Sequence, residues 1–497
     1  MHRGVRAALL LAFALLASAC IATPRGQLTP TPLAATATST PPPVTNVTLP
    51  AAQAEALLRR TVCWLADPAL APACLPPQQD ALLAIEEMGR SGDRRFTAPL
   101  VDLIALELGW RVPVDAALTR LTGASVSSPR AWREWLAHHP TPPPPGYAAW
   151  KARLLALTAA STQQPKYDVL LTERLGAALP LIHWIGVQPN ASRPLVTPRP
   201  VSGRASQFLA ATDVVYGIVA NEQARAYPQR IVSWHGLVND TLGGVPVVLS
   251  HCLPCGGAVA FDRRVGGRAL DFGTAGLALH SRTLLFDAQE SRLWDALTGE
   301  SIGEPRTSLT WLPAFTTTWQ DWLARHPDTT VVDTATGVVR DYTAGAATVD
   351  VAASAAPLYP VAPLDGRYQP REPVFGVAAG GAFRAYLVSE AESRRVIHDR
   401  LGTQDIVVLS EGRGLAIGAY KADGVQFQRL EGTGVDLVAI DEHGERWDMR
   451  EQALVHHATR KTLAAVPWRQ AYWFAWSGAY LTPASTPPVD AAPRPPQ

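Results

Sequence analysis

Residues 225–250 read RAYPQRIVSWHGLVNDTLGGVPVVLS, and the similar stretch at residues 384–410 reads RAYLVSEAESRRVIHDRLGTQDIVVLS. The two Arg-Ala-Tyr triplets lie 159 positions apart. Both stretches consist of short runs rich in β-branched residues with Gly-containing turns between them, which is typical of antiparallel strands with tight connections. The sequence therefore predicts one β-rich unit that occurs twice, at residues 200–345 and, as a divergent copy, at 373–482.

Comparison of the two copies distinguishes residues that both copies share, which belong to the scaffold, from residues that occur in one copy only. LLFDAQESRLW at residues 284–294 corresponds to VAIDEHGERW at 438–447, and each unit ends in a Trp-rich segment. Where the first copy has SHCLPCGGAVAFD (residues 250–262), the second has SEGRGLAIGAY, which keeps glycines but lacks both cysteines. We therefore interpret the glycine turn as part of the fold and the Cys-x-x-Cys pair as a candidate for chemistry.

A helical pattern precedes the β-rich units, over residues 51–190. The stretch DALLAIEEMGRSGDRRFTAPLVDLIALELG, residues 80–109, predicts two amphipathic helices around a Ser-Gly-Asp turn and resembles a HEAT-type helical hairpin. The predicted fold class is thus α+β, with a helical N-terminal segment followed by a duplicated, mainly antiparallel β-rich unit.

The ends of the chain predict its location. Residues 1–20 combine a basic start, a short apolar run and small residues before Cys20, a pattern similar to a lipoprotein signal peptide that ends at a lipidated cysteine. An ordinary cleaved signal is the alternative. Residues 21–50, rich in Thr, Pro and Ala, and the Pro-rich tail at 483–497 predict disordered segments. We expect an exported protein held by its lipid on the outer face of the cytoplasmic membrane.

The net charge and the cysteines restrict the possible partners and functional classes of the protein further. The formal net charge is only +1 and the basic residues are scattered, which argues against nucleic acid as a partner. Outside the cytoplasm thiols tend to pair, and Cys63 and Cys74 close a short Pro-rich loop, so we interpret them as a structural disulfide. Cys252 and Cys255 then remain as the pair whose role is open.

Several of these motifs together resemble a known family. ARAYPQRIVSWHGLVNDTLGGVPVVLSHCLPCGGAVAFDR, TLLFDAQESRLWDALTGESIGEP and TTTWQDWLARHPDT are similar to the bacterial exported family defined as domain of unknown function 3179, over residues 181–482. Some of its members are described as selenoproteins with selenocysteine at a motif cysteine. The resemblance therefore implies redox or soft-metal chemistry at Cys252 and Cys255. This chain departs from the family pattern at His251 and at residues 275–282, AGLALHSR.

Redox chemistry at the pair requires a thiolate, and in this chain a turn and a strand follow the motif where a thioredoxin has a helix. Stabilisation of the thiolate would have to come from turn N–H groups or from a histidine. His235 is the better candidate, because His251 is adjacent to Cys252 on a strand and its side chain points to the other face. The residues that we expect to border this site are His251, His280, Ser281 and Thr298.

Two other interpretations of the pair stay open. Cys252 and Cys255 could bind copper or zinc with a histidine such as His235, although a structural zinc site needs four ligands and no second Cys-x-x-Cys is present. Alternatively, they form an inert disulfide across a short loop, with a modest effect on stability.

We therefore expect a membrane-anchored lipoprotein with oxidoreductase-like thiol–disulfide or related redox chemistry at Cys252 and Cys255, which needs no cofactor. The alternative is a metal-binding, ligand-binding or scaffold module of the cell envelope in which these two cysteines form a structural disulfide. The expected partners are the membrane, through the N-terminal lipid, and an unidentified envelope protein or redox partner.

Overall fold

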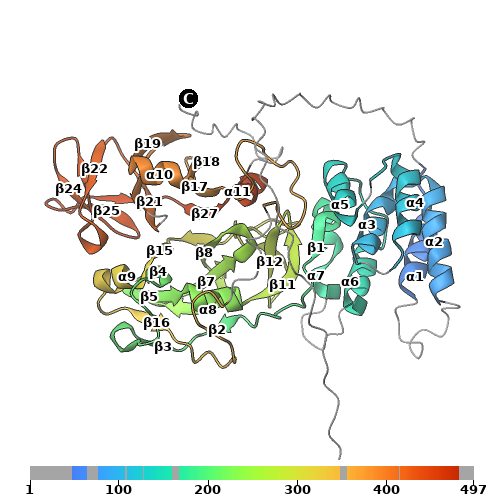
Figure 1. Cartoon of the computed structure of the whole chain (residues 1–497), viewed down its shortest axis with the longest axis horizontal. Helices are drawn as coiled ribbons and strands as arrows, with labels where there is room; N and C mark the ends of the chain where they lie inside the picture. Colours follow the sequence, from blue (N-terminus) through green and yellow to red (C-terminus); the bar gives the residue numbers. More distant parts are fainter. Residues whose placement is uncertain are drawn as a thin grey trace, which may run out of the picture. The chain divides into compact units, whose positions relative to one another are not determined.

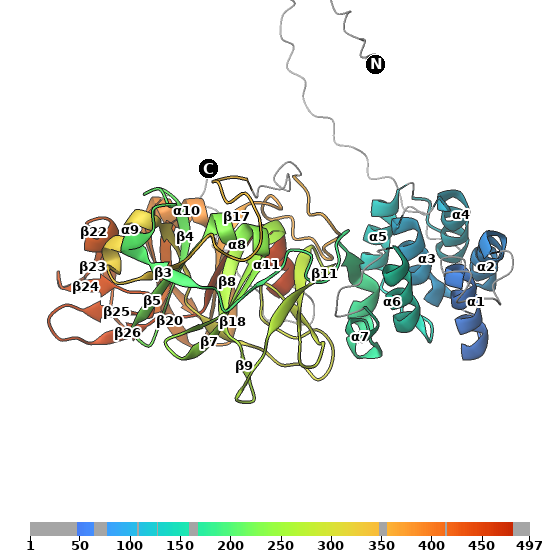
Figure 2. The same ribbon diagram turned by 90° about the horizontal axis from the view of Figure 1, so that it is seen from below.

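The computed structural model describes residues 47–63, 77–106, 109–126, 128–158, 167–346, 355–412 and 415–480. Helical elements come first, and Figures 1 and 2 show α1 to α6 packed beside one another. Their bounds are α1 (Ala51–Cys63), α2 (Pro77–Ser91), η1 (Arg94–Phe96), α3 (Thr97–Ala105), α4 (Arg111–Thr122), α5 (Pro129–His138), α6 (Tyr147–Thr158), α7 (Tyr167–Leu170) and η2 (Glu173–Leu181).

The two helices predicted over residues 80–109 are α2 and α3, but they do not pair as a hairpin, because α2 packs against α1 and α4 while α3 packs against α4 and α5. Ala81, Ile85 and Met88 recur at intervals of three or four residues and are fully buried, so α2 packs through one face. The helix ends before Gly92, and the carboxylate of Asp93 accepts a hydrogen bond from the backbone N–H of Arg95, which starts the next helical turn.

Two series of strands follow the helices, and the fold class is α+β as predicted. The first series comprises β1 (Ile182–Trp184), β2 (Leu195–Val196), β3 (Pro200–Ser202), η3 (Gly203–Ala205), β4 (Val214–Ala220), β5 (Gln223–Pro228), α8 (Gln229–His235), β6 (Leu237–Leu242), β7 (Val245–Cys252), η4 (Leu253–Cys255), β8 (Gly257–Asp262), β9 (Arg264–Val265), β10 (Arg268–Ala269), β11 (Phe272–Leu279), β12 (Arg282–Asp287), β13 (Leu293–Asp295), β14 (Thr310–Leu312), β15 (Phe315–Thr318), α9 (Trp319–Arg325) and β16 (Thr330–Val332).

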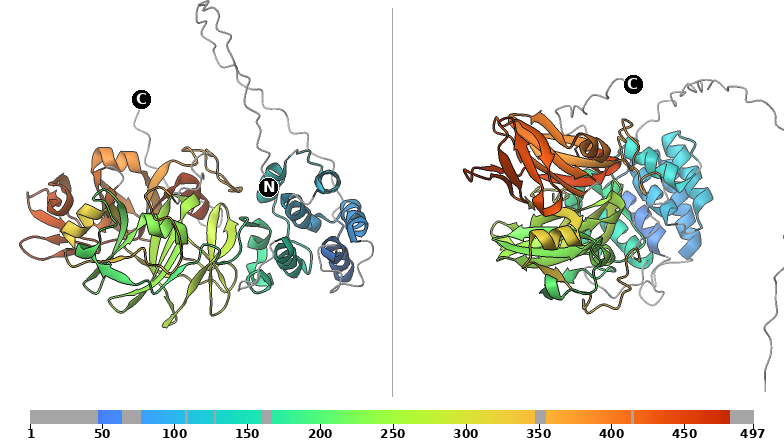
Figure 3. Two further views of the ribbon diagram at one scale, coloured as in Figure 1. Left: turned by 60° about the horizontal axis from the view of Figure 1, so that its bottom comes forward. Right: turned by 60° about the vertical axis from the view of Figure 1, so that its left-hand side comes forward.

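The second series comprises β17 (Pro373–Ala379), β18 (Ala382–Leu387), α10 (Val388–Arg394), β19 (Val396–Leu401), β20 (Gln404–Gly412), β21 (Leu415–Lys421), β22 (Phe427–Glu431), η6 (Gly434–Asp436), β23 (Val438–Asp441), β24 (Arg446–Met449), β25 (Ala453–His456), β26 (Thr462–Ala464), β27 (Trp468–Tyr472) and α11 (Trp473–Tyr480). Figure 3 shows this orange-to-red series beside the green first series, and β27 contacts β8.

The strand order is the same at three places in the two series. The order β15-β4-β5 corresponds to β27-β17-β18, and the meander β6-β7-β8 corresponds to β19-β20-β21. The order β11-β12-β13 likewise corresponds to β22-β23-β24. All of these pairs are antiparallel, as are most pairs among the described strands.

Side-chain contacts recur along with the strands. In each series an Arg and a Tyr from one strand of the first hairpin bind the Asp of the following strand, and a later Asp accepts a hydrogen bond from a Trp indole. The sets are Arg225, Tyr227 and Asp240 with Asp287 and Trp294, and Arg384, Tyr386 and Asp399 with Asp441 and Trp447. These shared residues therefore hold the scaffold together.

Each series also places a glycine under a tryptophan of its final helix. A Cβ on Gly217 would lie 2.2 Å from the ring of Trp322, and a Cβ on Gly376 would lie 2.2 Å from the ring of Trp476. Only glycine leaves room for an indole at this distance from the strand. The Trp-rich segments that end the two units therefore pack at equivalent positions in the two series.

The helical segment joins the first series through β1. Residues Ile182–Trp184 lie inside the stretch that the sequence pattern assigned to helices, but they pair antiparallel with β11. A single apolar cluster includes Leu154 and Leu179 of the helical segment together with Leu277 and Phe286 of β11 and β12. This stretch is a strand because its backbone completes the edge of that sheet.

Candidate functional site

The Cys-x-x-Cys loop connects β7 and β8. Cys252 ends β7, Cys255 ends the short 3-10 turn η4, and a disulfide joins them. Gly256 follows with a φ of +83°, a conformation that glycine adopts without strain. Cys252 is 1% exposed and Cys255 is 0% exposed, so the surrounding protein shields both sulfur atoms.

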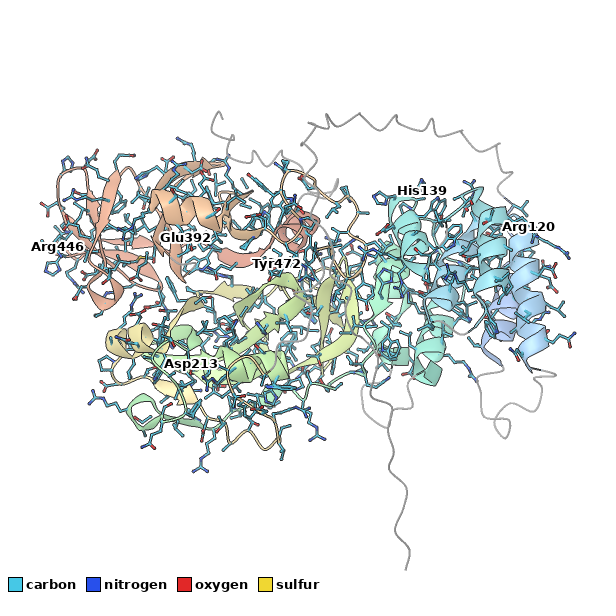
Figure 4. The ribbon with its side chains drawn as sticks, viewed as in Figure 1. Arg120, His139, Asp213, Glu392, Arg446 and Tyr472 are labelled. Carbon is cyan, nitrogen blue, oxygen red and sulfur yellow. A yellow bond between two sulfur atoms is a disulfide. The ribbon has the colours of Figure 1, made fainter. Side chains whose placement is uncertain are left out.

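The loop lies where the first series contacts the second. The two cysteines belong to an apolar cluster with Leu285 of β12 and Phe474 of α11. A Cβ on Gly257 would lie 2.0 Å from the backbone oxygen of Gln470 in β27, and Tyr472, labelled in Figure 4, lies against Gly256. The glycines that follow the cysteines therefore permit close contact between β8 and β27.

His235 lies at the C-terminal end of α8 and is fully buried. Its Nδ1 is 2.6 Å from the backbone oxygen of Arg193, and its Nε2 is 2.7 Å from the hydroxyl of Tyr342. Burial lowers the pKa of its imidazole. Among the hydrogen bonds of the described residues, those of His235 thus connect α8 to two loops, and none reaches the cysteines.

His251 points to the face of β7 opposite Cys252, as strand alternation predicts. Its ring lies 5.7 Å from the ring of Tyr216, whereas Cys252 packs in the cluster around Phe474. It is 7% exposed, and its Nδ1 has no hydrogen-bond partner among the described residues. Burial lowers the pKa of the His251 imidazole to about 4.

This buried imidazole predicts a specific loss of stability in acid. An unfolded histidine has a pKa of about 6.5, so protonation favours the unfolded chain once the pH falls below that value. The stability that neutral His251 contributes is complete above about pH 6.5, is lost as the pH falls towards 4, and the loss reaches about 2 kcal/mol at pH 5. Urea denaturation of the wild type and of His251→Phe at pH 7 and pH 5 measures it, and a variant that loses as much stability as the wild type would contradict it.

Three other sequence-predicted residues lie at or beside the turn between β11 and β12 and the loop after β13. His280 and Thr298 line one cavity of about 440 Å³. Ser281 faces another way, because its hydroxyl donates to the backbone oxygen of Tyr359 (2.9 Å) and accepts from the N–H of the same residue (2.6 Å). His280 and Ser281 both have positive φ values, 49° and 62°, which a tight two-residue hairpin turn requires.

The cavity also contains a buried ion pair that the sequence analysis did not select as a site. The Nε of Arg282 donates to Asp295 Oδ2 at 2.7 Å, and Asp295 Oδ1 accepts from the backbone N–H groups of Leu297 and Thr298. Arg282 is 5% exposed, and its Nη1 has no hydrogen-bond partner among the described residues. The guanidinium is thus fixed at one nitrogen and unsatisfied at another.

Charged groups of both signs complete the lining of this cavity. Arg174 and Arg306 are balanced by Glu300 and Glu304 near the Arg282–Asp295 pair. Burial, followed by the charge of Arg282, lowers the pKa of His280 to about 4, so its imidazole is neutral near pH 7. The cavity therefore has a formal charge of zero and several hydrogen-bonding groups.

Repeat comparison could have identified Arg282. Counting back from the equivalent Asp287 and Asp441, Arg282 corresponds to Asp436 in the second series. A basic residue at this place is thus a feature of the first copy only, which is the criterion that selected the cysteines. The ion pair with Asp295 had no such signal, because the two residues lie on different strands.

The sheet connects the cavity to the Cys-x-x-Cys loop. The turn η4 lies against β12, the strand that begins with Arg282. Leu285 of β12 and Leu297, adjacent to Thr298, belong to the apolar cluster that contains both cysteines. The Cys-x-x-Cys loop therefore packs against the strand that begins with Arg282.

The remaining predictions concern lipidation, the Cys63–Cys74 disulfide, metal binding and the membrane. Cys20, the predicted lipidation site, and Cys74, the predicted partner of Cys63, lie outside the described residues. Within the described ranges, no group of three or more His, Cys, Asp or Glu side chains is arranged to hold a metal ion. Likewise, no helix in those ranges is both long and apolar enough to cross a bilayer.

Comparison with known families identifies the β-rich part of the chain. A family described as a protein of unknown function (DUF3179) matches residues 193–483. The chain belongs to the DUF3179 family. The match spans both strand series from β2 onward, the Cys-x-x-Cys loop and the Arg282–Asp295 pair, and it confirms the family that the motifs predicted. No curated protein matches this DUF3179 member. No solved structure matches it either.

Proposed function

We propose that this DUF3179 protein is a ligand-binding module of the cell envelope, and that its site is the cavity at Arg282. One observation carries the proposal: a guanidinium that is 5% exposed lines a cavity of about 440 Å³, while its Nη1 lacks a partner among the described residues. An unsatisfied buried donor costs free energy, and a ligand acceptor at this place would remove that cost. The volume lies within the range of small-molecule sites.

Under this proposal, the Cys252–Cys255 disulfide has a structural role. The two sulfur atoms are shielded, and the loop packs against β12 and β27. A disulfide across so short a loop stabilises the fold by about 2 kcal/mol, which is enough to hold the loop in place behind the cavity. The copper or zinc alternative stays a prediction that metal analysis after anaerobic purification would test.

The proposed location follows from the sequence of the N-terminal region. The signal-like residues 1–20, lipidation at Cys20 and a tether at residues 21–50 would place the cavity outside the cytoplasm, on a membrane anchor. Labelling of the expressed protein with a palmitate analogue, with Cys20→Ser as the comparison, tests the anchor independently of ligand binding.

The ligand-binding proposal is tested with the purified full chain and a library of neutral, cationic and anionic small molecules. We expect one chemical class to raise the thermal unfolding midpoint, because a ligand that binds the folded chain stabilises it. Isothermal titration should then give one site per chain. A library with no stabilising member, combined with native mass spectrometry that finds no co-purified small molecule, would reject the proposal.

Thiol–disulfide chemistry is the second candidate function, and one observation favours it. Leu253, between the two cysteines, lines a separate cavity of about 390 Å³ that is also bordered by Asp213 and Arg230. Figure 4 labels Asp213, whose carboxylate forms an ion pair with Arg230. This cavity therefore borders the loop at Leu253, although Cys252 and Cys255 themselves are buried.

Thiol trapping in defined redox buffers separates the two candidates. A structural disulfide should have a potential below about −300 mV, whereas an active couple should lie well above that value. The double variant Cys252→Ser/Cys255→Ser should lose about 2 kcal/mol of stability and keep its ligand affinity. A potential near −200 mV would instead favour redox chemistry.

A further inference from the structure

We infer that the ligand of this cavity is a small organic acid with a single carboxylate, which accepts hydrogen bonds from the Arg282 guanidinium. This inference rests on the proposed function and specifies its substrate class. Guanidinium and carboxylate groups match in planar geometry, and a charge-assisted hydrogen bond is about twice as strong as a neutral one. Asp295 occupies only the Nε side of Arg282.

The position of Arg282 is fixed before a ligand arrives. Its Nε is held by Asp295, whose other carboxylate oxygen is held by the backbone N–H groups of Leu297 and Thr298. On the far side, a Cβ at Gly478 would lie 3.1 Å from Nη1 and 2.8 Å from Val361, so only glycine lets α11 pack this closely against the guanidinium. Little side-chain entropy remains to be lost on binding, which favours affinity.

The charge of the lining limits the charge of the ligand. Arg174, Arg282 and Arg306 are opposed by three carboxylates, those of Asp295, Glu300 and Glu304. A ligand with two or more negative charges, such as a phosphate monoester, would meet these carboxylates in addition to the arginines. A monoanion that places its charge at Arg282 avoids most of that repulsion.

The volume and the remaining polar groups describe the rest of the ligand. The cavity of about 440 Å³ is much larger than a carboxylate group alone, so the acid needs an organic body. Thr298 and the neutral imidazole of His280 offer hydrogen bonds, while Leu181, Leu279 and Ile302 offer apolar surface. A hydroxylated or aromatic monocarboxylic acid fits this combination of groups.

The experiment uses matched pairs of probes on the full chain, so that each acid is compared with a neutral molecule of nearly the same shape. The pairs are benzoate with benzamide, N-acetylglycine with N-acetylglycinamide, and gluconate with gluconamide, and phosphoglycolate serves as the multiply charged probe. We expect at least one acid to bind about 10- to 100-fold more tightly than its neutral twin in isothermal titration. Phosphoglycolate should bind more weakly than that acid.

Variants then locate the binding with the tightest acid. Arg282→Gln should weaken it about 10- to 100-fold, and Arg282→Lys should weaken it less, because the charge remains while the planar geometry is lost. Arg429→Gln is the control, since Arg429 is an exposed arginine of β22 in the second series. If Arg282→Gln does not fold, Arg282→Lys and the probe pairs still decide the question.

The outcomes separate the inference from the proposed function. If neutral twins bind as tightly as the acids, or if Arg282→Lys and Arg282→Gln bind the acid like the wild type, the carboxylate inference is wrong while ligand binding stands. If no probe binds and the broader library also has no stabilising member, both are wrong. Preference for phosphoglycolate over every monoanion likewise overturns the inference.

Discussion

Replacing Lys151 by methionine should lower the free energy of unfolding by about 3–5 kcal/mol. Lys151 of α6 is 1% exposed, and its Nζ lies 3.0 Å from Asp102 of α3 and 3.2 Å from the backbone oxygen of Leu179. The hydroxyl of Tyr147 also donates to Asp102, at 2.5 Å. Without the ammonium group, the Asp102 carboxylate would remain buried without an opposite charge. An unpaired buried charge destabilises the folded state strongly.

The pH dependence of this variant follows from the same burial. Burial lowers the pKa of Lys151 and raises that of Asp102, so desolvation outweighs attraction even in the intact pair. In Lys151→Met the pKa of Asp102 should rise further. The penalty is then complete above this raised pKa and shrinks as the pH falls towards about 3.9, the value in the unfolded chain. The deficit should therefore be smaller at pH 5 than at pH 7.

Urea denaturation followed by circular dichroism measures the effect, with two companion variants. Arg90→Met removes an exposed arginine of α2 that pairs with Glu86, and it should change the stability by less than about 0.5 kcal/mol. Adding Asp102→Asn to Lys151→Met should restore at least half of the loss, because no buried charge remains. A single variant as stable as Arg90→Met would show that the pair does not hold α3 and α6 together.

The fold was largely predictable because its pattern occurs twice. Alternating β-branched runs and Gly turns predict strands from local preferences, and their recurrence 159 residues later identifies the residues that both series need. Tyr227 and Trp294 were selected in this way, and both bind an aspartate of their own series. The edge strand β1 was missed because three residues carry too little periodicity, and pairing with β11 decides their conformation.

The site was less predictable, because it depends on contacts between distant segments. The sequence pattern assigned His280 and Thr298 to the border of the Cys-x-x-Cys loop, whereas in the structure they line the cavity at Arg282. The pairing of Arg282 with Asp295 and the close contact of Gly478 with Arg282 arise only when β12, β13 and α11 meet. His235 stood out as a histidine of the first copy, but its two ring nitrogens serve loop contacts that no local pattern encodes.

Gly257→Ala should be the most damaging single-methyl substitution in the Cys-x-x-Cys loop, with a loss of about 3 kcal/mol or more. The added Cβ would lie 2.0 Å from the backbone oxygen of Gln470 in β27. A backbone atom inside a strand cannot rotate away as a side chain does, so β8 and β27 would have to separate. That movement would disturb the apolar cluster that contains Cys252 and Cys255.

Gly366→Ala is the matched control, because Gly366 is exposed, has no atom within 4 Å of an added Cβ and needs no left-handed backbone. It should change the stability by less than about 0.5 kcal/mol. Thermal and urea denaturation compare the two variants, and hydrogen exchange should show faster exchange in β27 for Gly257→Ala only. Equal stability of the two variants would mean that β8 and β27 do not approach this closely. In that case, the glycines after the cysteines would serve only the turn, and the second series would not hold the disulfide loop behind the Arg282 cavity.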